Sequence, residues 1–348
     1  MKDFRPVALA FMVLLPAFAA RASDSLQVKP MDVLKGKPIV KVFSEWSRDF
    51  YGQDGSRLEI TRAYFGYQYD WSENYAAKIV FDAARLGELN SGTFDTTTKV
   101  LTTKKETRYE SFLKNASFEV KQVIPLTCFE LGLVGTRLFA IQEKAWGNRY
   151  VAKSFMDEKK FSPSADLGIN AQVQVHPTTK LYANLVQGEG FAAPQDAGSN
   201  YKSGGGIEFD APMGLVAYAF GDYMPIDNAS DQSTLAGFLG YSMAKKFRSG
   251  AEYNFQMNHL GVEKQDLTGM SFYSAVQAPF NLEFFGRFDY ATSEGNWNAA
   301  ADGETYIGGL QYTPISGLRL ALDYQAFSSY NTKLDLQHKV ALNTEFSY

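Results

Sequence analysis

The feature that most constrains this chain is a strict alternation of apolar and polar residues. In the segment "GLRLALDYQAF", Leu318, Leu320 and Leu322 alternate with Arg319 and Asp323. The same period of two recurs in "SADLGINAQVQVH", "FRSGAEYNFQM", "NLEFFGRFDY" and the closing "HKVALNTEFSY". A period of two fits a β-strand with one apolar and one polar face, whereas a helix requires a period of 3.6. The chain is therefore expected to be all-β.

Applied to the whole chain, this period predicts about sixteen strands, or fourteen if the most ambiguous segments are not strands. The predicted strands are 37–49, 58–71, 75–85, 108–121, 127–136, 164–176, 180–190, 200–211, 214–223, 231–243, 246–257, 267–277, 281–292, 302–313, 317–328 and 334–348.

The links between the predicted strands alternate in length. Links after even-numbered strands are tight, such as "SEN", "PTTK" and "AKK", whereas the longest links, 86–107 and 137–163, follow odd-numbered strands. This places all turns at one end of a sheet and all loops at the other, as in bacterial outer-membrane barrels. A sheet that crosses lipid must close on itself, because no backbone polar group there can stay unpaired. Residues 37–348 are therefore predicted to form a closed antiparallel transmembrane β-barrel.

The two ends of the chain support export to that membrane. Residues 1–22 have a basic start, a short apolar stretch and a small-residue pattern, which is typical of a signal peptide cleaved before Ser23. Residues 23–36 are predicted to be an N-terminal lead-in. At the other end, Phe346 and Tyr348 match the aromatic ending that marks barrels for the assembly machinery. The expected location is the outer membrane of a Gram-negative bacterium, with lipid and that machinery as partners.

Composition excludes several classes of function. The chain has a net charge of −4, which argues against nucleic acid as a partner. Its single cysteine, Cys128, permits no internal disulfide. No HExxH, CxxC or GxSxG motif occurs, and the three histidines are scattered. We therefore expect no metal, no cofactor and no enzyme, although a barrel hydrolase and a secreted soluble β-sandwich are alternatives.

The link 137–163 is the most informative segment. It mixes six basic and three acidic residues with large apolar side chains, which a loop surrounded by water does not need. We expect this third long loop to fold into the lumen and narrow it. The alternative is an outside loop packed against neighbouring loops or another subunit. The predicted constriction residues are Arg137, Glu143, Lys144, Arg149 and Lys153.

Charged residues on the polar parity are predicted to line the lumen wall. Each one has a simpler explanation as a cross-strand pair of little individual weight. Together they indicate a hydrated interior, and a barrel of about sixteen strands leaves an aqueous channel. These residues are Arg62, Lys78, Asp82, Arg248, Glu252, Glu283, Arg287, Asp289, Arg319 and Asp323.

Three blocks in the first half of the chain resemble one porin family. The segments "RAYFGYQYDWSENYAAKIVFD" (62–82), "FLKNASFEV" (112–120) and the stretch 143–169 resemble porins of the phosphate-selective porin O and P superfamily, in the versions of Bacteroidetes-like bacteria. The resemblance implies a passive outer-membrane channel, often a homotrimer. It does not imply phosphate, because no arginine ladder can be matched residue by residue.

The function expected from these features is passive diffusion of small hydrophilic solutes or ions through a charged constriction. The main alternative is a non-conducting outer-membrane barrel that binds or adheres through its outer loops. The two differ in whether the lumen is open.

Overall fold

The structure is a computed structural model that describes residues 36–51, 55–85, 89–94, 101–106, 109–193, 200–243, 246–331 and 334–348. Its contacts divide the chain into Met1–Gly36 and Lys37–Tyr348, and all described strands belong to the second unit. The predicted signal peptide (1–22) and the predicted lead-in, apart from its last residue, lie outside the described residues.

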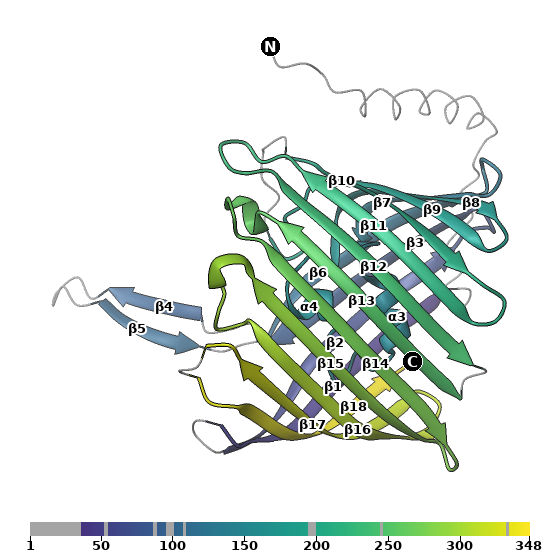
Figure 1. The fold of residues 1–348 in the computed structure, drawn as a ribbon. Helices are drawn as coiled ribbons and strands as arrows, with labels where there is room; N and C mark the ends of the chain where they lie inside the picture. The colour runs from purple at the N-terminus through teal and green to yellow at the C-terminus, as the bar shows by residue number, and fades with distance from the viewer. Residues whose placement is uncertain are drawn as a thin grey trace. The chain divides into compact units, whose positions relative to one another are not determined.

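Sixteen of the described strands form one closed antiparallel barrel (Figure 1). Each pairs with its neighbours in sequence, except that β3 pairs directly with β6 across an inserted hairpin and β18 pairs with β1 to close the barrel. The predicted barrel is confirmed, with sixteen strands rather than fourteen. The barrel strands are β1 (Lys37–Asp49), β2 (Gly55–Asp70), β3 (Tyr75–Arg85), β6 (Tyr109–Lys121), β7 (Thr127–Gly135), β8 (Ala165–His176), β9 (Thr179–Val186), β10 (Lys202–Asp210), β11 (Leu215–Met224), β12 (Gln232–Met243), β13 (Phe247–Met257), β14 (Leu267–Ala278), β15 (Leu282–Ser293), β16 (Gly303–Ile315), β17 (Leu318–Ser329) and β18 (Gln337–Ser347).

Closure of the barrel explains why the alternation continues to the last residues. Strand β18 pairs with β1, with Ser347 opposite Lys41 and Phe346 opposite Val42. Although β18 ends at Ser347, one residue before its predicted end, the Tyr348 amide still donates to the Val40 carbonyl at 3.0 Å. The C-terminus is thus part of the hydrogen-bonded wall.

The predicted asymmetry of the links is present. Turns after β2, β6, β8, β10, β12, β14 and β16 span at most five residues, whereas the links at the other end include 86–108 and 136–164. The first of these contains a hairpin of β4 (Leu89–Phe94) and β5 (Leu101–Glu106), which was not predicted because its sequence lacks apolar alternation. Short helices also lie in the links, namely α3 (Ala140–Trp146), α4 (Phe155–Glu158), η2 (His259–Gly261) and η3 (Glu294–Asn296).

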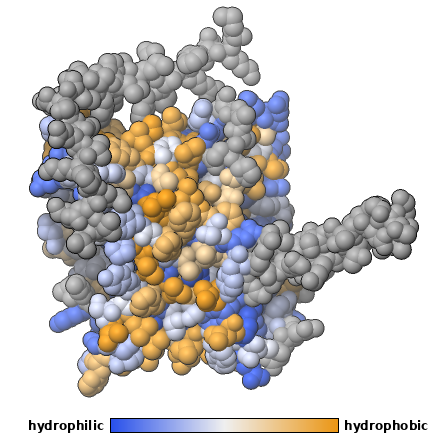
Figure 2. Space-filling model, turned by 180° about the vertical axis from the view of Figure 1, so that it is seen from behind, coloured by the Kyte–Doolittle hydropathy of each residue, from blue (hydrophilic) through white to orange (hydrophobic). Residues whose placement is uncertain are grey.

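The two parities of each strand face different surroundings. On β17, Leu322 is 56% exposed and points outward, while its neighbours Ala321 and Asp323 are buried and point inward. Figure 2 shows apolar side chains spread across one side of the wall. An apolar outer band is what a lipid bilayer requires of a barrel. No helix in the described part of the chain has the length and apolarity to cross a bilayer.

Candidate functional site

The third long loop, residues 136–164, lies inside the barrel. It leaves β7, forms α3 and α4, and returns to β8, while its large apolar side chains are buried against the inner wall. The Trp146 ring packs edge-on against Tyr273 of β14 and Phe285 of β15, at centroid distances of 5.6 and 6.0 Å. The prediction that the loop folds into the lumen is confirmed. Its most buried apolar residues are Leu138, Trp146, Phe155 and Met156.

A glycine ends α3 and redirects the loop across the lumen. Gly147 has a φ of 73°, in the left-handed region, and its amide donates to the Glu143 carbonyl at 3.0 Å. A Cβ at this position would lie 3.2 Å from the Nε of Arg248, so a larger residue would also crowd the Arg248 guanidinium. Glycine therefore serves both the helix end and the close approach to β13.

Three wall arginines hold the segment 146–153 from three strands. Arg248 donates to the Trp146 carbonyl at 3.2 Å, Arg319 to the Gly147 carbonyl at 2.8 Å, and Arg287 to the Lys153 carbonyl at 2.5 Å. Each arginine also pairs with a nearly buried wall carboxylate. The pairs are Arg248–Glu283 at 2.5 Å, Arg319–Glu345 at 2.6 Å and Arg287–Asp289 at 2.7 Å.

These contacts revise the interpretation of the wall charges. The sequence indicated arginines in contact with lumen water, but Arg287 is 5% exposed and Glu283 is 2% exposed. Because each carboxylate orients a guanidinium whose remaining N–H groups bond loop carbonyls, the pairs fix the backbone of the third loop. Glu252 also points inward and is buried, with the Asn254 amide as a partner.

The loop separates two cavities of the interior, and we call the region where their linings share residues the neck. The cavity toward the long loops has a volume of about 770 Å³, and the one toward the short turns about 410 Å³. Phe43 of β1 and Arg149 of the third loop line both cavities. The Phe43 ring reaches the loop at Tyr150, with centroids 6.4 Å apart. The neck therefore lies between β1 and the third loop.

Charges at the neck are paired on the loop side. The Arg149 guanidinium lies 3.2 Å from the Glu143 carboxylate and 3.1 Å from the Asp157 carboxylate. The loop has six basic and three acidic residues, but its excess of positive charge is not free at Arg149, which is offset by two acidic groups that the same loop supplies.

The wall opposite the loop carries a second ion-pair cluster, with one carboxylate and two cations. Asp82 of β3 pairs with Arg62 at 3.0 Å and with Lys114 at 3.6 Å. The Lys114 ammonium also lies 4.7 Å from the centroid of the Tyr64 ring. Tyr64 in turn packs edge-on against Phe43 at 5.8 Å. The neck thus combines aromatic faces with paired charges.

Away from the neck, both cavities carry an excess of basic residues. Seven basic and four acidic side chains line the outer cavity, while five basic and two acidic ones line the inner cavity. No carboxylate of a described residue lies within 4.0 Å of the ammonium groups of Lys144, Lys153 or Lys160. The lumen is therefore electropositive beside its neck, although the whole chain has a net charge of −4.

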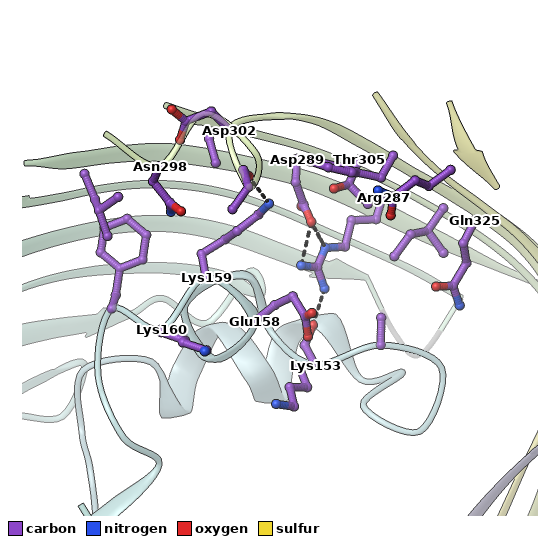
Figure 3. Close-up of a pocket in the computed structure, with 18 of the residues that line it drawn as sticks. Lys153, Glu158, Lys159, Lys160, Arg287, Asp289, Asn298, Asp302, Thr305 and Gln325 are labelled. Carbon is purple, nitrogen blue, oxygen red and sulfur yellow. Dashed lines mark hydrogen bonds and ion pairs between the residues drawn. The ribbon is translucent and has the colours of Figure 1, made fainter. Parts of the chain in front are cut away.

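Figure 3 shows the outer cavity with the third loop beneath strands of the wall. The Lys159 ammonium donates to the Ala301 carbonyl at 3.0 Å and lies 4.9 Å from the Phe327 ring centroid, joining the third loop to the link after β15. Burial lowers the pKa of Lys159. Lys153 and Lys160 extend from the same loop and line the cavity.

The predicted constriction residues are only partly brought together. Glu143 and Lys144 line the inner cavity, Lys153 lines the outer one, and Arg149 lines both. Arg137 lines neither of these cavities. Its guanidinium lies 3.7 Å from Glu130 and over the Tyr182 ring at 5.6 Å.

The remaining predicted wall residues all lie on inward positions. Lys78 lies 3.8 Å from Glu130, and Asp323 accepts hydrogen bonds from Gln325 and Asn343 at 2.8 and 2.7 Å. Asp323 is only 3% exposed, so it faces other polar side chains rather than bulk water.

Sequence reasoning missed the aromatic part of the neck. Phe43 lies on the same parity as Lys41, Glu45 and Ser47, and Tyr64 shares the parity of Arg62. An aromatic residue among polar inward positions is the signal that could have identified both. It marks a place where the lumen is packed rather than hydrated.

Comparisons with known proteins give the class of fold. No family model matches the sequence, and no curated protein is similar to it in sequence. Among solved structures, the chain is similar to Salmonella typhi OmpF in complex with daunomycin, with 10% identity over 90% of this chain and 97% of that one and a TM-score of 0.63. It is also similar to the outer-membrane channel DcaP of Acinetobacter baumannii, with 11% identity, 92% and 99% coverage and a TM-score of 0.61. A third similar structure is that of Pseudomonas putida OprB at high pH, with 7% identity over 90% of this chain and 94% of that one and a TM-score of 0.65.

These similarities extend over nearly whole chains at very low identity, so they define the fold. The chain has the fold of an outer-membrane porin, a closed barrel of sixteen antiparallel strands. The finer resemblance to the phosphate-selective porin O and P superfamily stays a prediction.

Proposed function

We propose that this protein is a passive diffusion channel for small hydrophilic solutes and ions in the outer membrane of a Gram-negative bacterium, and not an enzyme. The observation that carries the proposal is the arrangement of two lumen cavities on either side of one neck, which both reach Phe43 and Arg149. A solute entering from the loop end would meet the outer cavity, the neck and the inner cavity in that order.

The charges favour anions over cations of similar size. Ammonium groups with no carboxylate of a described residue within 4.0 Å line both cavities, Lys153 and Lys160 on the outer side and Lys144 on the inner side. In a narrow pore with low-dielectric walls, field lines concentrate and a few charges control which ions enter. The pairing of Arg149 with Glu143 and Asp157 weakens this preference at the neck itself.

Lipid and the barrel-assembly machinery are the proposed partners, and a homotrimer is the proposed assembly. The outward apolar wall supports contact with lipid. The C-terminal Phe346 and Tyr348 are exposed on that outer face, where an assembly factor could reach them.

The alternative is a barrel that binds through its outer loops and conducts nothing. The observation that supports this alternative is the third loop, whose apolar side chains pack inside the lumen and narrow the path for ions. Planar-bilayer recording separates the two. We expect discrete conductance steps in KCl from the refolded barrel, and a correctly folded barrel that stays silent would refute the channel.

A further inference from the structure

The outer cavity has two chemically different sides. One side carries apolar side chains at inward positions of three adjacent strands, Leu267 on β14, Ala291 on β15 and Ile307 on β16. Thr305 and the Arg287–Asp289 ion pair lie among them on the same face. The side chains of Phe161 and Trp297, on the flanking loops, extend this surface. All five apolar side chains belong to the apolar cluster inside the barrel or pack against it. The three wall side chains are at most 7% exposed, so they pack mainly within that cluster, and their remaining surface gives the cavity an apolar border.

The neighbouring part of the wall and the floor of the cavity carry basic residues. Arg62 and Lys339 come from the wall, where each is paired with a carboxylate. Lys153 and Lys160 come from the third loop, and no carboxylate of a described residue lies within 4.0 Å of either ammonium. Glu158 is the exposed acidic residue on the same floor (Figure 3).

The backbone holds Lys160 in an unusual conformation. Its φ of 60° lies in the left-handed region, which residues other than glycine rarely adopt. The next amide, of Phe161, donates to the Met156 carbonyl at 2.9 Å and so fixes this turn. The Phe161 carbonyl in turn accepts from the Gln256 amide of the wall at 2.7 Å. The same turn therefore sets a cation and an apolar ring beside one cavity.

We propose that the outer cavity is a binding subsite for small organic carboxylates that carry an apolar ring. This inference rests on the proposed channel function, since the ligand would occupy the conduction path. The carboxylate would lie toward Lys153 and Lys160, and the ring toward Leu267, Ala291 and Ile307. A volume of about 770 Å³ is within the range of cavities that hold small organic ligands.

The same lining disfavours strongly hydrated inorganic anions. An anion such as inorganic phosphate loses water on entry and needs a hydrogen-bond donor on every side, because buried charge is costly unless it is fully paired. Here Leu267, Ala291 and Ile307 offer it none, and the Arg287 guanidinium on the same face is already bonded to Asp289 and to the Lys153 carbonyl. A ring carboxylate presents its charge to one side only and gains from burying apolar area on the other.

The test is block of KCl current through single channels at pH 7.5, with probes added on the loop side. The probes are benzoate, acetate, inorganic phosphate and benzyl alcohol. Partial burial of the benzoate ring predicts a half-blocking concentration about tenfold below that of acetate. Benzyl alcohol, which lacks the charge, should not block over the same range. Equal block by benzoate and acetate, tighter block by phosphate, or equal block by benzyl alcohol would each overturn the proposal.

Two variants locate the subsite. The double variant Lys153→Gln/Lys160→Gln should raise the half-blocking concentration of benzoate about tenfold. Ile307→Thr replaces the ethyl group of the side chain by a hydroxyl. It should raise the half-blocking concentration of benzoate about threefold and leave that of acetate unchanged. The matched control is Lys264→Gln, at an exposed loop lysine that does not line the cavity. If the control weakens benzoate block as much as the double variant, the subsite is not in this cavity.

Conductance and block test the two proposals separately. If the barrel shows no KCl conductance, the proposed channel function fails. If it conducts and benzoate does not block it more strongly than acetate, only the subsite fails.

Discussion

Replacing Arg248, one of the three wall arginines that hold the third loop, should destabilise the barrel and free the loop. Arg248 contacts the Glu283 carboxylate at 2.5 and 2.7 Å and also donates to the Trp146 carbonyl and to the Asn148 side chain, both at 3.2 Å. In Arg248→Met, Glu283 would remain a carboxylate with a side chain only 2% exposed. Breaking a buried pair in this way costs about 3–5 kcal/mol. The Arg248 side chain is 24% exposed, so water entry should bring the cost to about 3 kcal/mol.

Removing the charge of Glu283 as well tests whether its unpaired carboxylate causes the loss of stability in Arg248→Met. In Arg248→Met/Glu283→Gln no buried charge is left, and the remaining loss is that of the hydrogen bonds to the loop. The cost should then fall to about 1–2 kcal/mol. Both variants are compared with the parent by denaturant titration in lipid vesicles. If the double variant is as unstable as the single one, the reasoning about the buried pair is refuted.

Single-channel current shows whether Arg248 positions the third loop or only stabilises the barrel. We expect current through Arg248→Met to fluctuate, because the loop segment next to the neck loses two of its anchors. The control is Lys180→Met, which breaks the wall pair Lys180–Glu208 of 2.9 Å. Neither residue of that pair has a hydrogen bond or ion pair to the third loop among the described contacts. Equal fluctuation in the two variants would show that the arginine does not position the loop.

Three further predictions follow from the wall, the loops and the C-terminus. Leu320→Arg, at an outward position of β17, should destabilise the barrel by about 2–4 kcal/mol if the residue lies near the bilayer midplane. Denaturant titration measures this, and no change would contradict the outward assignment. Burial, with smaller contributions from nearby Lys160 and Lys202, lowers the pKa of His259 in the folded protein. The unfolded chain then binds the proton more readily, so stability should decline as the pH falls below about 6.5. This decline should be smaller in His259→Gln, and identical pH profiles in vesicles would refute it. Finally, Phe346→Ala/Tyr348→Ala should lower the yield of barrel assembled in cells by more than it lowers refolding yield in vitro, and equal losses would argue against an assembly signal.

The strands were predictable because a barrel wall repeats one physical rule at every position. Lipid outside and polar groups inside impose the period of two, so most strand boundaries agree with the prediction within about three residues. The hairpin β4–β5 is outside that rule, since it does not belong to the barrel sheet and its sequence has no apolar face.

The site was predictable only in outline. The apolar residues of the third loop indicated that it docks, and Trp146 and Phe155 are indeed buried in the lumen. The partners of Arg248, Arg287 and Arg319 were not predictable, because they are backbone carbonyls more than 100 positions away in the sequence. A periodicity identifies which way a side chain points but not what lies opposite it.

The most direct test of the account is the zero-current potential across a bilayer under a KCl gradient. The account predicts an open lumen that prefers chloride, because lysines with no ion-pair partner among the described residues stand on both sides of the neck. Lys144→Glu/Lys153→Glu changes one such lysine in each cavity, and neither has a carboxylate within 4.0 Å among the described residues, so folding should survive. The potential of this variant should shift toward cation preference. A parent that prefers potassium would contradict the electropositive lumen, and a potential that the double substitution leaves unchanged would contradict conduction past the third loop.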